Sequence, residues 1–161
     1  MWKGGVRVTI FDDQDRLLMV KHVHPEREVW MVPGGAIEED ESSRAAAARE
    51  VLEETGLEVE VQSLFWHVEE VSERGQRFVN YYKAKVTGGE LGLGADPEFG
   101  EDEQVLEDIR YVSREEMAQL EHVYPNALRE ELWEMYDAGE LEQDAYRVRE
   151  ERPTIRPHLK V

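Results

Sequence analysis

The segment at residues 35–57, GAIEEDESSRAAAAREVLEETGL, limits what this chain can fold into more than any other, because it fits one helix between two glycines. Ser42 or Ser43 can cap the N-terminus of that helix, and the alanine run at 45–48 favours helical backbone. Gly56 suits the left-handed residue that ends a helix. The segment therefore predicts a helix that begins at Ser42 or Ser43 and stops at Gly56.

Three glutamates of this helix share one face. At about 100° per residue, Glu50, Glu53 and Glu54 fall within an arc of roughly 100°. The apolar residues on the other arcs are expected to face a core; they are Ala45, Ala48, Val51 and Leu52. Like charges at this spacing cost a bare helix roughly 0.2–0.5 kcal/mol per pair, and Arg49, four residues before Glu53, supplies only part of the counter-charge. The remaining charge suits a hard divalent cation such as Mg²⁺, which takes one or two carboxylates together with waters and substrate phosphates.

The whole segment matches a longer pattern, GX5EX7REUXEEXGU, in which U is a bulky aliphatic residue. All specified positions are filled, by Gly35, Glu41, Arg49, Glu50, Val51, Glu53, Glu54, Gly56 and Leu57. This pattern is the Nudix box, and the chain resembles a Nudix hydrolase of the MutT type. The sequence WMVPGG at 30–35 is a common lead-in to the box, and the flanking strands and helices extend the resemblance over residues 4 to about 138.

The resemblance implies roles for the box residues. It implies a loop-helix-loop that binds Mg²⁺ or Mn²⁺ through the carbonyl of Gly35 and the carboxylates of Glu50, Glu53 and Glu54. It also implies that Arg49 orients a box carboxylate and acts with the catalytic glutamates. Glu41 and Gly56 would support the box structurally.

The box alone does not fix the general base. Glu50 is one candidate, because MutT-type enzymes can use the first glutamate of the REUXEE segment. A carboxylate bound to Mg²⁺ has a lowered pKa and is a weaker base, so a loop carboxylate would serve better. The loop offers Glu98, Glu101 and Glu103, and we favour Glu103 because related proteins often place an acidic residue just before the last strand.

The charge of the chain limits its partners. A formal net charge of −18 and a pI near 4.6 argue against binding to DNA, RNA or anionic membrane, which need a basic surface. A small phosphate compound must then be held by local basic residues and bound metal. The chain has no cysteine, which excludes disulfides and thiol nucleophiles, and no apolar run long enough to span a bilayer. A cytoplasmic location is expected.

Alternating apolar and polar residues predict strands on both sides of the box. In order, the predicted strands cover residues 4–11, 16–21, 29–32, 58–71, 77–86 and 104–112. The turn-forming cluster at 12–15 makes the first two an opening β-hairpin, and the alternation slips near Ser63, which predicts a bulge. His22 and His24 are interpreted as ordinary loop side chains, because no further histidine or cysteine cluster accompanies them.

The strand predicted at 77–86 carries aromatic and basic residues. Its aromatic residues can stack on a nucleobase or belong to the core; they are Phe78, Tyr81 and Tyr82. Its basic residues concentrate positive charge in a very acidic chain; they are Arg77, Lys83 and Lys85. These three and Tyr81 are the candidate substrate-binding residues, with the cations placed near substrate phosphates.

The C-terminal third reads as a loop, a strand and two helices. Residues 87–103 are rich in glycine and acids, which predicts a long surface loop. Ser113 and Glu116 form a capping box for a short helix that ends near Leu120. Apolar periodicity predicts a second helix at 126–137.

Together these elements predict one α/β domain at residues 1–139, a Nudix-type α/β/α sandwich with a mixed, curved β-sheet. The box helix would lie on one face of the sheet and the C-terminal helices on another. Residues 140–161 have little apolar periodicity and are expected to form a flexible tail or an arm that clasps a partner subunit. The resemblance adds the expectation of a homodimer.

The activity that the resemblance implies is metal-dependent hydrolysis of the diphosphate bond in a nucleoside diphosphate linked to another moiety, such as a nucleotide, a nucleotide sugar or a second nucleoside. An isomerase of allylic diphosphates shares the fold, but it would normally need an active-site cysteine. A non-catalytic nucleotide-binding or regulatory module would normally carry a broken box. Subfamilies of the ADP-ribose type resemble one another in a proline shortly after the box. No proline occurs here between Pro33 and Pro97, which disfavours ADP-ribose as the substrate, and no other subfamily signature is matched.

Overall fold

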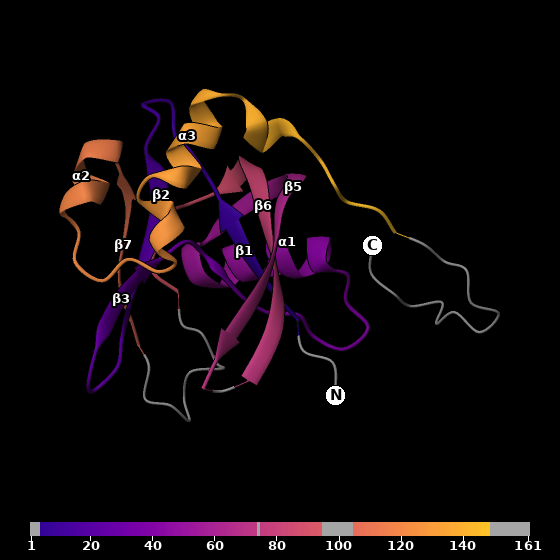
Figure 1. Ribbon diagram of the computed structural model, residues 1–161, viewed down its shortest axis with the longest axis horizontal. Helices are drawn as coiled ribbons and strands as arrows, with labels where there is room; N and C mark the ends of the chain where they lie inside the picture. The colour runs from indigo at the N-terminus through magenta and orange to yellow at the C-terminus, as the bar shows by residue number, and fades with distance from the viewer. Residues whose placement is uncertain (1–3, 74, 95–104, 149–161) are drawn as a thin grey trace.

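The computed structural model describes residues 4–73, 75–94 and 105–148 (Figure 1). Its strands are β1 (Gly4–Thr9), β2 (Leu17–Val23), β3 (Glu28–Met31), β4 (Gly34–Ala36), β5 (Leu57–Ser72), β6 (Gly75–Gly89) and β7 (Val105–Val112). Its helices are α1 (Ser43–Thr55), α2 (Arg114–Gln119) and α3 (Glu131–Asp137), with short 3-10 turns η2 (Asn126–Leu128) and η3 (Glu140–Glu142). No helix of the described chain is long and apolar enough to cross a membrane.

The strands form two sheets rather than one. The first has the order β4-β1-β6-β5, with β1 parallel to β6 and the other pairs antiparallel, and the second has the order β3-β2-β7. The predicted opening hairpin is present only at its turn, where the Asp12 N–H donates to the Arg16 carbonyl at 3.0 Å and the Leu18 N–H to the Ile10 carbonyl at 2.9 Å. β1 already has neighbours on both edges, so β2 pairs with β3 and β7 instead. Only one bridge, between Phe11 and Leu17, joins the two predicted hairpin arms.

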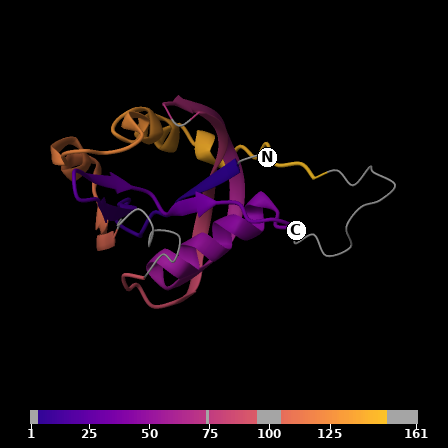
Figure 2. The ribbon, with the colours of Figure 1, turned by 90° about the horizontal axis from the view of Figure 1, so that it is seen from below.

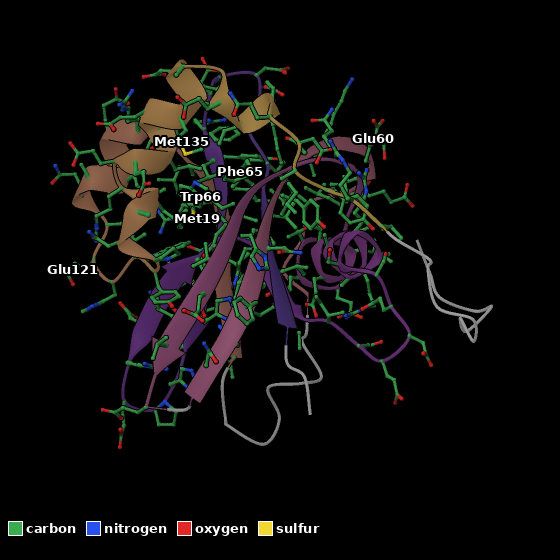
Figure 3. The ribbon with its side chains drawn as sticks, turned by 45° about the vertical axis from the view of Figure 1, so that its right-hand side comes forward. Met19, Glu60, Phe65, Trp66, Glu121 and Met135 are labelled. Carbon is green, nitrogen blue, oxygen red and sulfur yellow. The ribbon has the colours of Figure 1, made fainter. Side chains whose placement is uncertain are left out.

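The layers are those of an α/β/α sandwich, as predicted. Seen from below, α1 lies on one side of the strands and the C-terminal helices lie on the other (Figure 2). Alternation along β1 directs Val6 and Val8 into the core beneath α1. A second core lies under α3, where Met19, Phe65, Trp66 and Met135 gather (Figure 3).

Helix α1 begins and ends as predicted. The side chain of Ser42 accepts a hydrogen bond from the Ala45 N–H, and Gly56 has a left-handed φ of 75°. The predicted apolar arc is only partly right, because Leu52 is 50% exposed while Val51 is buried. The face of α1 that carries Glu50 and Glu54 packs against the rest of the protein, and Leu52 lies on the exposed face.

The β5–β6 hairpin anchors the segment that follows α3. The predicted bulge near Ser63 is confirmed by register shifts between Val61 and Leu64. There the Leu64 N–H donates to Asp144 at 2.9 Å, and the Leu64 carbonyl accepts from Ala145 at 3.0 Å. Leu141 is buried as well, so the first residues of the predicted segment 140–161 pack on β5.

The C-terminal helices differ in part from the prediction. The capping box is present, since the Ser113 side chain binds the Glu116 N–H and the Glu116 side chain binds the Ser113 N–H. The second predicted helix is broken into η2 and α3. Glu130, which precedes α3, has a non-helical φ of −138°. Between them, the Arg129 guanidinium donates to carbonyls at the end of α2, at 2.9 and 2.7 Å.

Candidate active site

The glutamates of α1 are not a solvated face. Glu50 and Glu54 are fully buried, and the side chain of Glu53 is one-third exposed. Burying a carboxylate is costly unless hydrogen bonds or opposite charge compensate. The box must therefore supply such partners.

Glu54 is held by the strand that precedes the helix. Its Oε1 accepts a hydrogen bond from the Gly34 N–H at 2.7 Å. Position 34 requires glycine, because a Cβ there would lie 2.1 Å from the carbonyl oxygen of Val6. The close approach of β4 to β1 thus places a backbone donor against Glu54.

Gly35 and Glu50 occupy adjoining space. A Cβ at position 35 would lie 2.5 Å from both the Cδ and the Oε1 of Glu50. Only glycine lets the carboxylate approach the chain in this way. The Gly35 backbone and the Glu50 carboxylate, both implied metal ligands, are therefore neighbours.

Arg49 connects the carboxylates of the box. Its Nε and one terminal nitrogen donate to both oxygens of Glu41, at 2.8 and 3.0 Å. Its other terminal nitrogen donates to Glu50 at 3.0 Å and to Glu53 at 3.2 Å. The hydrogen bonds that Arg49 donates to Glu41, followed by the charges of Glu50 and Glu41, raise the pKa of Arg49. Arg49 thus contacts more carboxylates than the single pair with Glu53 that helical spacing predicts.

The residues present fit a hard divalent cation. The single positive charge of Arg49 is shared by Glu41, Glu50 and Glu53, which leaves the site an excess of negative charge. Within the described residues, no three acidic or histidine side chains converge into a complete metal cage. The carboxylate oxygens that are present are nevertheless the type of ligand that hard divalent cations take.

His22 is the site residue that the sequence analysis missed. It belongs to β2 rather than to a loop, it is 1% exposed, and its Nε2 lies 3.7 Å from the Glu54 Oε2. Burial, aided by the charge of Arg7, lowers the pKa of His22 to about 3, so the imidazole is neutral at pH 7. The contact with Glu54 is therefore not an ion pair. Extending the alternation of the second strand by two residues would have placed His22 inside.

The aromatic residues of β6 are core residues. Tyr81 is 1% exposed and packs edge-on against Trp66 at 5.4 Å between ring centroids, which favours the core alternative, and its contact with a substrate stays a prediction. Tyr82 is fully buried beneath α1. Phe78 stacks on the His67 ring at 5.4 Å. The core alternative holds for both tyrosines.

The basic residues of β6 lie apart from the box glutamates in the described contacts. Arg77 pairs with Glu70 at 2.7 Å, Lys83 pairs with Glu142, and Lys85 is exposed. By alternation they share the face of β6 that points away from α1. Their role at substrate phosphates stays a prediction. Glu103, the favoured general base, lies outside the described residues.

Comparison with known proteins gives partial relatives. The NUDIX domain model matches residues 1–136. The chain is 34% identical over 93 residues to the 8-oxo-dGDP phosphatase NUDT18 of Mus musculus, which covers 56% of this chain and 28% of the relative. It is 40% identical over 59 residues to the RNA pyrophosphohydrolase of Dinoroseobacter shibae, covering 37% of each. The chain thus spans well under half the length of these curated relatives.

Solved structures share the fold over most of the chain. A NUDIX hydrolase from Nitrosomonas europaea superposes with a TM-score of 0.70 at 22% identity, covering 87% of this chain and 91% of the other. A UDP-X diphosphatase gives 0.65 at 19% identity, with 86% and 64% covered. Identities this low establish the fold alone. With the family model matched over most of the sequence and the box glutamates gathered around Arg49, the chain belongs to the Nudix hydrolase family.

Proposed function

We propose that this protein is a metal-dependent hydrolase that cleaves the diphosphate bond of a nucleoside diphosphate linked to another moiety. The observation that carries the proposal is the burial of Glu50 and Glu54 against Gly35 and Gly34, with Arg49 holding the neighbouring carboxylates. A protein that needed these residues only for stability would gain more from apolar side chains. A buried excess of carboxylate is instead what cation binding requires.

The residues of the chain divide the chemistry among them. Arg49 fixes the orientation of Glu50 and Glu53, and the Gly34 N–H fixes one oxygen of Glu54. A bound Mg²⁺ or Mn²⁺ would supply charge neutralisation at the phosphate oxygens and a water of lowered pKa. A carboxylate, Glu103 or Glu50, takes the proton of the attacking water. The attack is substitution at phosphorus, and no covalent enzyme intermediate is needed.

The relatives support the substrate class without naming one compound. They are described as acting on 8-oxo-dGDP and RNA, and the feature common to these is phosphate esterified to a nucleoside. The net charge of −18 weighs against a long RNA chain, whose phosphates would be repelled. A small nucleoside diphosphate derivative is therefore the proposed substrate.

A second candidate function is a binding or regulatory module without turnover. The intact box weighs against it. A panel of 8-oxo-dGDP, dNTPs, nucleotide sugars, ADP-ribose and dinucleoside polyphosphates, assayed with Mg²⁺ or Mn²⁺, tests both functions through release of phosphate or pyrophosphate. Turnover by the wild type that is lost in Glu54→Gln supports the hydrolase. Nucleotide binding without turnover across the panel supports the module instead.

The homodimer and the cytoplasmic location are kept as proposals. One support for the dimer has weakened, because residues 140–146 pack on their own β5 instead of extending toward a partner. Light scattering at micromolar concentration tests the dimer, and a mass equal to one chain would end that proposal.

A further inference from the structure

Arg7 is a half-buried arginine in the middle of β1 that the box pattern does not include. Its register partners are Gly34 on β4 and Tyr81 on β6. Because Val6 and Val8 point into the core beneath α1, Arg7 points to the opposite face of the sheet. It therefore lies on the side where the two sheets face each other.

The guanidinium of Arg7 has an unusual environment for so acidic a chain. Among the described residues, no carboxylate forms an ion pair with Arg7, and one terminal nitrogen donates to the Val32 carbonyl at 3.2 Å. Two other half-buried arginines without a carboxylate, Arg44 and Arg129, each bind two carbonyls. Guanidinium has five N–H donors in a fork that matches phosphate. Within the described part of the chain, Arg7 thus keeps charge and N–H donors that no carboxylate uses.

Arg7 also lies beside the box. A Cβ on Gly34 would be 2.8 Å from the Arg7 Cδ, and the Gly34 N–H is the group that binds Glu54. The charge of Arg7 acts on His22, whose Nε2 is 3.7 Å from Glu54. The Arg7 side chain and the buried end of the box are therefore separated by a single strand residue.

The surface beside β3 is open to solvent at Tyr124. This residue is 41% exposed, its N–H donates to the Trp30 carbonyl at 3.0 Å, and the charge of Arg7 is among those that act on its pKa. Tyr81 is the register partner of Arg7 on β6, so the two residues lie side by side on this face of the sheet. Arg77 is already paired with Glu70 at 2.7 Å, which leaves Arg7 as the cation there without a carboxylate among the described residues.

We infer that Arg7 binds a phosphate group of the substrate, on the side of that group opposite the box glutamates. The inference rests on the proposed function, because it assigns a second contact to the same diphosphate. A guanidinium binds phosphate oxygens by charge-assisted, often bidentate hydrogen bonds. With a cation at the glutamates and the Arg7 guanidinium on a phosphate oxygen, two positive charges would neutralise the diphosphate.

Binding of methylenediphosphonate, a diphosphate that cannot be hydrolysed, tests Arg7 by calorimetry in the presence of Mg²⁺. Arg7→Gln should weaken binding by about 10–100-fold, which is the range of a lost charge-assisted hydrogen bond. Arg7→Lys keeps the charge but loses the fork, so a smaller loss of several-fold is expected. Arg114→Gln makes the same charge change at an exposed residue of α2 and should leave the Kd unchanged.

Steady-state kinetics gives the second readout. Arg7→Gln should raise KM for the best substrate of the panel more than it lowers kcat, because the contact exists before and during the reaction. A purely structural role would lower the melting temperature without separating KM from kcat. If Arg7→Gln does not fold, Arg7→Lys carries the test.

The outcomes separate this inference from the proposed function. If the wild type binds methylenediphosphonate and Arg7→Gln loses that binding, Arg7 is a phosphate contact even when no substrate is turned over. If the wild type hydrolyses a substrate while Arg7→Gln and Arg7→Lys keep its Kd and KM, Arg7 has no such role and only the hydrolase survives.

Discussion

The chain that follows β6 closes the C-terminal end of α1, and one glycine there should control the position of two metal-ligand candidates. The Gly92 N–H donates to the Thr55 carbonyl and the Gly94 N–H to the Glu54 carbonyl, each at 2.9 Å. A Cβ at Gly94 would lie 1.8 Å from the carbonyl oxygen of Glu53, whereas a Cβ at Gly92 meets nothing within 4 Å. The two glycines form a matched pair.

The expected cost of Gly94→Ala follows from these contacts. The clash is with helix backbone, which cannot move aside as a side chain can, so the loop must withdraw. Withdrawal forfeits the hydrogen bond to Glu54, worth about 0.5–1.5 kcal/mol, and residual overpacking adds about 1–3 kcal/mol. At about 2–4 °C per kcal/mol for a domain of this size, the melting temperature should fall by about 3–18 °C. Gly92→Ala should stay within about 0.5 kcal/mol of the wild type.

Thermal unfolding and Mn²⁺ titration of both variants measure the effect. Gly94→Ala should also weaken Mn²⁺ binding, because the carbonyls it disturbs belong to Glu53 and Glu54. Gly92→Ala should bind Mn²⁺ as the wild type does. Equal melting temperatures and equal Mn²⁺ affinities for the two variants would show that the loop is not seated on α1.

Three further outcomes are expected. Glu54→Gln should lose metal affinity, measured by calorimetry with Mn²⁺, and should lower turnover at least about 100-fold. Its melting temperature without metal should hold or rise, because a buried charge is removed. Leu141→Ala should lower the free energy of unfolding by about 2–5 kcal/mol in urea, and a negligible change would restore the tail interpretation. Backbone hydrogen bonds from Leu64 and Tyr146 lower the pKa of Asp144 from 3.8, so its stabilisation is complete above that pH and is lost as pH falls through the folded pKa. Urea midpoints of Asp144→Asn should therefore vary less with pH below about 4 than those of the wild type.

Local chemistry was readable from the sequence. The start and end of α1 depend on Ser42 and Gly56, and the start of α2 depends on Ser113 and Glu116. Each of these signals acts within a few residues of the bond it makes, so no distant partner can override it. The box pattern identified the family for a similar reason, because the spacing of the box glutamates on one helix is a local property.

Burial and strand partners depended on tertiary structure. The charge of Glu50 and Glu54 predicts solvent exposure, yet both are buried because Gly34 and Gly35 allow the chain to approach them. No local pattern reports that approach. The burial of His22 could be read from the strand alternation, but its contact with Glu54 could not, because Glu54 is far away in sequence.

The sequence by itself determined the box helix, its caps and the family, since these follow from contacts within one or two helical turns. The tertiary structure decided that β1 pairs with β6 and β4 instead of β2, because an edge already occupied excludes a sequence neighbour. It also decided that Leu141 belongs to the core. The role inferred for Arg7 depends on tertiary structure too. The sequence places an arginine in a strand, but only the fold places it beside Gly34 and without an ion pair to any described carboxylate.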